Sequence, residues 1–196
     1  MGRPKGLVEG VGYHSGERPT SEKGKHTFEY RTWANMLKRC YNKASLDERV
    51  TYLDKEVCTL WLDYCNFYDW FQDVKFYRQG WQLDKDLLIK GNKIYGPETC
   101  LFLPPTINGV LLKCDKSRGE LPLGVHYDRD RMKYKATCCN ENGKQWQKRF
   151  NSVEEAFASY KQEKERVMRA LALRYRDDID PRAYDALMNY TVEITD

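Results

Sequence analysis

Two aspartates and an asparagine in the middle of the chain could hold a divalent cation. Asp84 and Asp86 are two residues apart, and Asn108 follows after a turn-rich loop and a short apolar segment. Residues two apart on a strand point to the same side, so both carboxylates could face one ion that Asn108 approaches from a following helix. Carboxylate and amide oxygens are the ligands that hard cations prefer. The sequence therefore predicts a magnesium or manganese site at Asp84, Asp86 and Asn108.

The same carboxylates have a second interpretation that needs no metal. Carboxylates at a strand end commonly accept hydrogen bonds from backbone N–H groups and nearby lysines, here Lys85, Lys90 and Lys93. Hydrolysis of a phosphodiester also needs a base that takes a proton near pH 7, which an unperturbed His can do and an unperturbed Asp cannot. The chain holds three histidines, all of them outside residues 81–108: His14, His26 and His126.

The segments around these residues predict a ββα unit. Trp81 to Leu88 has the pattern of a strand, Cys100 to Leu103 that of a second strand, and a helix is expected to begin at Pro104 or Pro105. The loop between the two strands contains four turn-forming residues: Gly91, Asn92, Gly96 and Pro97.

This layout resembles the ββα-metal (HNH) endonuclease finger. In that family the first strand ends in a metal-binding Asp or His, a His that acts as general base follows directly, and an Asn or His on the helix completes the metal shell. The resemblance implies metal ligation by Asp84 or Asp86 together with Asn108, and it puts Lys85 or Leu87 at the base position. The finger is therefore expected to be degenerate for catalysis unless a histidine from outside it supplies the base.

Two amphipathic helices are expected before the ββα unit. Residues 1–25 are rich in Gly, Pro, Ser, Lys and Glu and are expected to form a flexible basic arm. Apolar residues then recur at helical spacing from Thr27 to Tyr41 and again from Val57 to Asp73. The second of these helices is dense in aromatic residues and is expected to support the ββα unit.

The pattern changes after a polar stretch, Lys113 to Pro122, that is the best linker candidate. Three short strands are expected in sequence, the last two joined by the turn NENG, and a helix should follow with Ser152 and Glu155 as a capping box. The helix should cover one face of the sheet and leave the other for a partner. The tail after Asp177 could add an edge strand. The predicted strands are Gly124 to Asp128, Lys133 to Cys139 and Lys144 to Phe150.

Positive charge is concentrated in two blocks, although the net charge is only +4. Residues 1–39 hold eight basic and four acidic residues, and residues 123–150 hold seven basic and three acidic residues, a net +4 in each. The rest of the chain must therefore sum to −4. Such blocks indicate a polyanionic partner, although a basic stripe is also a common solvated surface.

The C-terminal strands and helix resemble the DNA-binding domain of ethylene-response-factor (APETALA) type, over Gly124 to about Lys161. GVHYD, KYKA, a basic third strand and SVEEAFASY carry the resemblance. In that family a three-stranded sheet lies in the DNA major groove, with arginines and aromatic residues touching bases and phosphates. Trp146 could instead pack on its own helix. The candidate DNA-binding residues are Arg129, Arg131, Lys133, Lys135, Trp146, Lys148 and Arg149.

The whole pattern predicts an α+β protein, with a helical N-terminal half that supports an HNH-like ββα unit, followed by a three-stranded antiparallel sheet packed on one long helix. An HNH-like finger followed by such a sheet resembles a group of phage proteins of the homing-endonuclease type. The expected parts are an arm at 1–25, a helical and ββα domain at 26–113, a linker at 114–122, a sheet domain at 123–176 and a tail at 177–196.

Three functions agree with these features. The first is a phage-type protein that binds double-stranded DNA, needs no cofactor to do so and carries a degenerate finger. The second is an active metal-dependent DNA nickase or endonuclease with magnesium or manganese at Asp84, Asp86 and Asn108. The third is a phage protein that binds and inhibits a host protein. The oligomeric state is not predictable from these residues.

Neither a signal peptide nor a membrane span is indicated, so the cytoplasm is the expected location. The seven cysteines include no CxxC pair, which favours reduced, buried thiols over a zinc site.

Overall fold

The fold is described from a computed structural model, in which residues 6–42, 54–111 and 121–196 are described. It is α+β, as predicted, with a helical N-terminal half, a ββα segment and a three-stranded antiparallel sheet packed on a long helix. In the described part of the chain, no helix combines the length and apolar character that crossing a bilayer requires. The chain divides into two compact units, each made of two segments: Met1–Tyr77 with Leu83–Leu101 (unit 1), and Arg78–Gln82 with Phe102–Asp196 (unit 2).

The division between the units falls within the ββα segment and not at the expected linker. Most of that linker, residues 114–120, lies outside the described residues, as do residues 1–5 of the expected arm. The predicted domain boundaries therefore stay predictions.

The first predicted helix of unit 1 is confirmed. Helix α1 (Phe28–Tyr41) begins directly after Thr27, whose side chain accepts a hydrogen bond from the backbone N–H of Tyr30. This bond satisfies one of the N–H groups that the first turn of any helix leaves without a partner. The residues that α1 buries have the predicted helical spacing: Trp33, Met36, Leu37 and Cys40.

The described part of the expected arm makes specific contacts within unit 1. Strands β1 (Ser21–Glu22) and β2 (Lys25–His26) form a small antiparallel hairpin. Upstream of it, the backbone of Tyr13 hydrogen-bonds to residues on both sides of Asp63. The guanidinium of Arg18 pairs with the carboxylate of Asp69 at 2.7 Å. Composition alone gave no sign of these contacts.

The second predicted helix is interrupted at Asp63. It forms as α3 (Thr59–Leu62) and α4 (Tyr64–Asp73), and Asp63 itself has an extended backbone conformation. The Asp63 carboxylate caps α4 by accepting a hydrogen bond from the N–H of Cys65 at 3.0 Å, and it also accepts one from the N–H of Ser15 at 3.2 Å. The Asp63 side chain therefore binds both the N-terminal segment and helix α4, and these two contacts keep α3 and α4 separate.

The ββα segment forms with a shorter first strand than predicted. Strand β4 (Gln82–Asp84) ends four residues before the expected Leu88, and it pairs with β6 (Leu101–Leu103), which precedes helix α5 (Pro105–Leu111). A further strand, β5 (Ile94–Tyr95), pairs in parallel with β3 (Glu56–Val57), which lies before α3 in the chain. The loop of the segment is therefore tied to unit 1 by backbone hydrogen bonds, a pairing that the sequence did not indicate.

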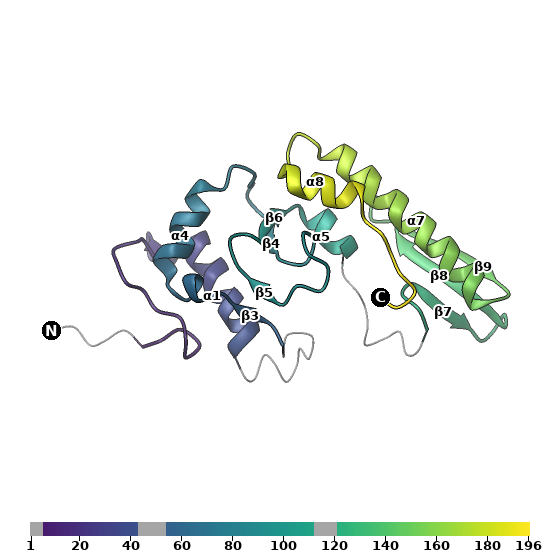
Figure 1. Ribbon diagram of the computed structural model, residues 1–196, viewed down its shortest axis with the longest axis horizontal. Helices are drawn as coiled ribbons and strands as arrows, with labels where there is room; N and C mark the ends of the chain where they lie inside the picture. The colour runs from purple at the N-terminus through teal and green to yellow at the C-terminus, as the bar shows by residue number, and fades with distance from the viewer. Residues whose placement is uncertain (1–5, 43–53, 112–120) are drawn as a thin grey trace. The chain divides into compact units, whose positions relative to one another are not determined.

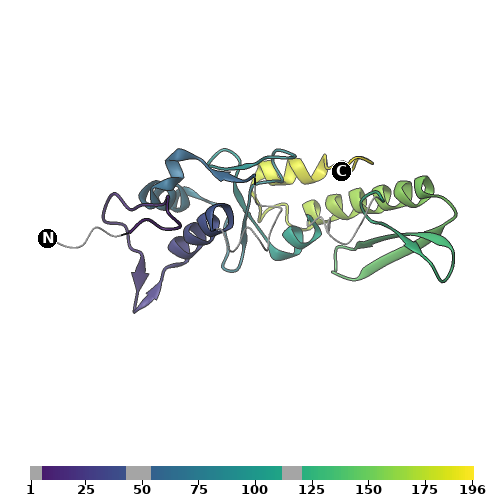
Figure 2. The ribbon, with the colours of Figure 1, turned by 90° about the horizontal axis from the view of Figure 1, so that it is seen from below.

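Unit 2 contains the predicted antiparallel sheet, in the order β7-β8-β9. Its strands are β7 (Val125–Asp128), β8 (Lys133–Cys139) and β9 (Gln145–Phe150). Gly143, in the turn before β9, has a φ of +75°, as the NENG turn predicted. Helix α7 (Val153–Arg174) begins at Ser152, whose side chain accepts the N–H of Glu155, and it runs along one face of the sheet (Figure 1, Figure 2).

Small residues let α7 lie close to the sheet. Ala136 and Cys138 of β8 pack in one buried cluster with Ala156, Phe157 and Tyr160 of α7. Gly124, just before β7, has a φ of +75°, and a Cβ atom there would lie 2.1 Å from the Tyr160 ring. No other residue type could therefore occupy position 124 without displacing Tyr160.

The tail forms a helix and a packed end in place of the expected edge strand. Helix α8 (Pro181–Met188) lies beside α7 (Figure 1, Figure 2). After it, Val192 is fully buried, its carbonyl accepts a hydrogen bond from Lys161 at 2.6 Å, and its N–H donates to Glu165 at 3.2 Å. Both backbone groups of Val192 thus hydrogen-bond to side chains of α7, whereas in an edge strand they would pair with a neighbouring strand.

Candidate functional site

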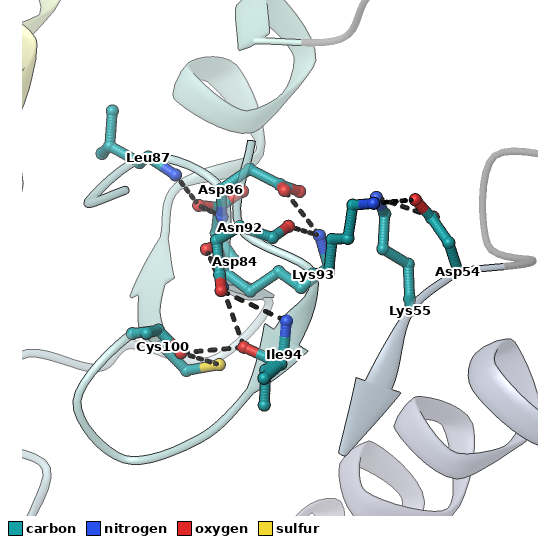
Figure 3. Close-up of polar contacts among 11 residues, drawn as sticks. Asp54, Lys55, Asp84, Asp86, Leu87, Asn92, Lys93, Ile94 and Cys100 are labelled. Atoms are coloured by element: carbon teal, nitrogen blue, oxygen red, sulfur yellow. Dashed lines mark hydrogen bonds and ion pairs between the residues drawn. The ribbon is translucent and has the colours of Figure 1, made fainter. Parts of the chain in front are cut away.

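The first predicted metal ligand, Asp84, is buried and binds its own backbone. One of its carboxylate oxygens accepts the N–H groups of Asp86 at 3.0 Å and Leu87 at 2.8 Å (Figure 3). This turn ends β4, because a backbone that folds back onto the Asp84 side chain cannot continue as a strand. Burial raises the pKa of Asp84, and the hydrogen bond from Leu87 offsets part of that effect.

The second predicted ligand, Asp86, pairs with a buried lysine. The Asp86 side chain is exposed, whereas that of Lys85 is only 2% exposed. The Lys85 ammonium donates to the Asp86 carboxylate and to the carbonyl of Asn92, the latter at 3.1 Å. It also lies 5.5 Å from the centre of the Tyr95 ring, where a cation is attracted to the π-electrons. Lys85 therefore places a fixed positive charge inside the turn.

Asn92 holds the loop between the strands in one conformation. Its side-chain amide donates to the carbonyls of Lys85 and Ile94, both at 2.8 Å, and its side-chain oxygen accepts the N–H of Ile94 at 3.2 Å (Figure 3). Nearby, Lys93 and Lys55 both pair with Asp54 at 3.0 Å. The sequence marked Asn92 only as a turn residue and gave no sign that Lys85 would be buried.

The expected metal ligands are not held as a set within one unit. Asp84 and Asp86 belong to unit 1 and Asn108 to unit 2, where its amide donates to the side chain of Gln82. The two carboxylates do not share a strand face, because β4 ends at Asp84. Among the described residues, no group of three or more His, Cys, Asp or Glu side chains is arranged to hold a metal ion.

The contacts of Asp84 and Asp86 correspond to the interpretation without metal. One oxygen of Asp84 accepts two backbone N–H groups, and one oxygen of Asp86 pairs with the buried ammonium of Lys85. Metal ligation by Asp84, Asp86 and Asn108 stays a prediction.

The histidines of unit 1 are engaged away from the ββα loop. His14 hydrogen-bonds to the carbonyl of Arg18 at 2.9 Å, and His26 to the carbonyl of Thr20 at 3.1 Å. Within the described part of unit 1, neither ring hydrogen-bonds to Asp84 or Asp86. The third histidine, His126, lies on β7 of the sheet. The hydrogen bonds of His14 and His26 thus connect them to the N-terminal segment and not to the ββα loop.

The register of the sheet divides its side chains into two faces. Directly opposed residues on neighbouring strands lie on the same face. Lys135 of β8 is opposed by His126 of β7 and by Arg149 of β9, and Lys133 is opposed by Asp128. Since Ala136 packs against α7, these residues lie on the side away from that helix. We call this side the outer face; it comprises His126, Asp128, Lys133, Lys135, Thr137, Cys139, Gln145, Gln147 and Arg149.

Two of the predicted DNA-binding residues are not on the outer face. Trp146 is opposed by Cys138, and Lys148 by Ala136, so both lie on the α7 side of the sheet. Trp146 packs against the buried cluster, and the Lys148 ammonium lies 5.7 Å from the centre of its ring. The alternative placement of Trp146, against its own helix, is the one that the structure has.

The other five candidates lie on the outer face or at its end. Lys133, Lys135 and Arg149 are on the outer face, and Arg129 and Arg131 are exposed in the turn that joins β7 to β8. The Lys133 ammonium also donates to the side chain of Asn151 at 2.6 Å. The structure thus brings together most of the predicted basic set.

One acidic residue of the outer face was not among the candidates. The Asp128 carboxylate accepts a hydrogen bond from Nε of Arg149 at 2.8 Å and lies 3.6 Å from a guanidinium nitrogen of Arg131. The hydrogen bond from Arg149 is the main reason that the pKa of Asp128 lies below its usual value. On the same face, burial and then the nearby charge of Lys135 lower the pKa of His126.

Comparison with known proteins does not assign the chain to a family. No family model, no curated protein and no solved structure gave a significant match.

Proposed function

We propose that the protein binds double-stranded DNA through the outer face of the β7-β8-β9 sheet, and that its HNH-like finger is a structural element of a phage-type DNA-binding protein. The observation that carries the proposal is the strand register. It places Lys133, Lys135 and Arg149 side by side on the face that α7 leaves open. Three basic residues stand there against a single acidic one, Asp128.

The shape of this face suits a duplex. The major groove admits a β-ribbon, and lysines along such a ribbon would lie near phosphates. The two exposed arginines of the β7–β8 turn, Arg129 and Arg131, extend the positive charge beyond the strands. Binding of this kind releases counterions from the DNA and therefore weakens steeply as salt is added.

The finger supports this function without catalysis. Its central charge is the buried ammonium of Lys85, and the side chains of Asp84 and Asp86 are engaged in the turn itself. A turn held together by these hydrogen bonds would preserve the ββα shape. The proposal therefore assigns DNA affinity to the sheet and not to a metal centre.

Salt-dependent binding to a fluorescent duplex tests the proposal. The double variant Lys133→Glu with Lys135→Glu should reduce affinity strongly, since each reversal turns an attraction to phosphate into a repulsion. The logarithm of the wild-type association constant should fall linearly with the logarithm of salt concentration, with a slope of about −0.9 for each phosphate neutralised. Binding that is absent or independent of salt would refute the proposal.

A matched pair of single variants locates the surface. Lys135 and Lys148 lie on neighbouring strands but on opposite faces of the sheet. Lys135→Glu should weaken duplex binding by about tenfold or more, whereas Lys148→Glu, with the same change of charge, should have a much smaller effect. Equal effects of the two variants would assign binding to overall charge and not to the outer face.

A further inference from the structure

The Arg149 side chain crosses the middle of the outer face. Its strand, β9, and the strand of Asp128, β7, are the two outer strands of the sheet, with β8 between them. Neighbouring strands are spaced by about 4.8 Å, so the 2.8 Å bond from Arg149 Nε to Asp128 can form only if the arginine lies across β8. Its guanidinium is therefore fixed over the central strand, between Lys133 and Lys135.

Asp128 is unfavourable for simple attraction to a polyanion. It is the only carboxylate on the outer face, and its side chain is 11% exposed. Its negative charge offsets the charge of Arg149 and, at 3.6 Å, part of that of Arg131. If the outer face served only to attract phosphates, an uncharged residue at position 128 would give a higher affinity. The geometry points instead to a role in directing the arginine.

The hydrogen bond leaves the recognition edge of Arg149 available. A guanidinium has five N–H donors in a rigid planar fork. Asp128 takes the Nε–H, and among the described residues this is the only hydrogen bond that the guanidinium makes. The two terminal nitrogens can therefore still donate in parallel to the O6 and N7 atoms of a guanine, which is the commonest specific contact in the major groove.

We propose that Asp128 is a positioning residue that holds Arg149 across the sheet so that its terminal nitrogens read a guanine. This inference rests on the proposed DNA-binding function and adds sequence discrimination to it. Lys133 and Lys135, on either side of the guanidinium, would contact the flanking phosphates and set the depth of the sheet in the groove. Asp128 then lowers the affinity for DNA of any sequence, and it raises the discrimination between the preferred sequence and others.

Selection from a pool of duplexes with a randomised centre provides the ligand for the test. Full-length protein is used to enrich a preferred duplex, and affinity is then measured for that duplex and for the unselected pool. The ratio of the two dissociation constants measures discrimination. For the wild-type protein we expect a preferred duplex that contains an invariant guanine.

Two variants separate positioning from charge. Asp128→Asn should tighten binding to the pool, because a negative charge is removed, and should reduce the discrimination ratio by about tenfold, because Arg149 is no longer held by a carboxylate. Arg149→Lys keeps the positive charge but lacks the fork, so it should reduce the ratio with little change in affinity for the pool. The thermal unfolding midpoint of each variant verifies that it is folded.

Asp130→Asn is the matched control. Asp130 is exposed in the β7–β8 turn, two residues from Asp128, and its replacement makes the same change of charge. It should tighten binding to the pool and leave the ratio unchanged. An equal loss of discrimination in Asp130→Asn, or an unchanged ratio in either Asp128→Asn or Arg149→Lys, would overturn the inference.

The outcomes also separate this inference from the proposed function. Salt-dependent binding to the pool without enrichment of any sequence would overturn the role of Asp128 and leave duplex binding intact. Failure to bind any duplex would overturn both.

Discussion

The buried Lys85 is the least expected residue of the ββα segment, and its contribution to stability can be measured. Lys85→Ala removes a buried aliphatic chain and leaves the carbonyl of Asn92 without its donor. Loss of buried methylene groups and of that hydrogen bond together should lower the free energy of unfolding by about 2–4 kcal/mol. Urea-induced unfolding measures the change.

Lys93→Ala is the control for this prediction, because the Lys93 side chain is 60% exposed and pairs with Asp54 at the surface. It should cost less than about 1 kcal/mol. Lys85→Met should recover at least half of the loss, because it restores the aliphatic chain. Equal effects of Lys85→Ala and Lys93→Ala would show that Lys85 is not an internal support of the turn.

His126 makes the stability of the sheet depend on pH. Its pKa is lowered in the folded protein, first by burial and then by Lys135, so the unfolded chain takes up the proton more readily. Stability is therefore fully present above the ordinary histidine pKa of about 6.5 and falls as the pH drops below it. Thermal unfolding between pH 7 and pH 5 should show this loss, and His126→Gln should reduce it. A variant with the same pH profile as the wild type would refute the assignment.

Residues on the sheet show where sequence patterns stop being informative. In β9, one alternating set contains Lys144, Trp146 and Lys148 and the other contains Gln145, Gln147 and Arg149, so both sets are mostly polar. Polarity therefore does not show which set faces α7. The strand register shows that the set with Lys148 does, because Lys148 is opposed by Ala136, which packs against α7. Asp128 could not be predicted as part of the DNA-binding set, because its role depends on a contact across β8 with Arg149, which is 21 residues away in the chain.

At the scale of elements, local signals predicted more than distant contacts did. The bounds of β8 were predicted from its strand pattern between two turns, and α7 starts at its capping box, because both signals lie within a few residues of the element they define. The break between α3 and α4 depends on Ser15, which is 48 residues from Asp63. The pairing of β3 with β5 is also non-local, and no periodicity reports it.

The cap at Asp63 should stabilise α4 and the N-terminal segment together. Burial disfavours the charged form of Asp63, but hydrogen bonds from Ser15 and Cys65 outweigh burial and keep its pKa below the usual value. Asp63→Ala removes an N-cap and should lower the free energy of unfolding by about 1–2 kcal/mol, with increased hydrogen exchange at the N–H groups of Ser15 and Cys65. Asp63→Asn, which still accepts hydrogen bonds, should lose less. Unchanged exchange in Asp63→Ala would contradict the link.

At the scale of the whole molecule, the ββα segment and the β7-β8-β9 sheet lead to different expectations for activity. The order of elements was predictable because strands and helices follow from short patterns. The engagement of Asp84 and Asp86 was not predictable, because it depends on where β4 stops and on which lysine is buried. Because the carboxylates of this turn already bind Lys85 and the backbone, we expect no metal-dependent cleavage there.

The protein should therefore bind DNA without cutting it. Purified protein incubated with supercoiled plasmid and magnesium or manganese should leave the plasmid intact on an agarose gel. Residues 81–108 contain no histidine, and the carboxylates of Asp84 and Asp86 are held by Lys85 and the backbone. Duplex binding should persist in the presence of a chelator, because contacts to phosphates need no metal ion in the protein. Asp86→Ala should change neither result. Nicking that persists on purification and disappears in Asp86→Ala, but not in Asp130→Ala, would instead establish a metal-dependent nuclease.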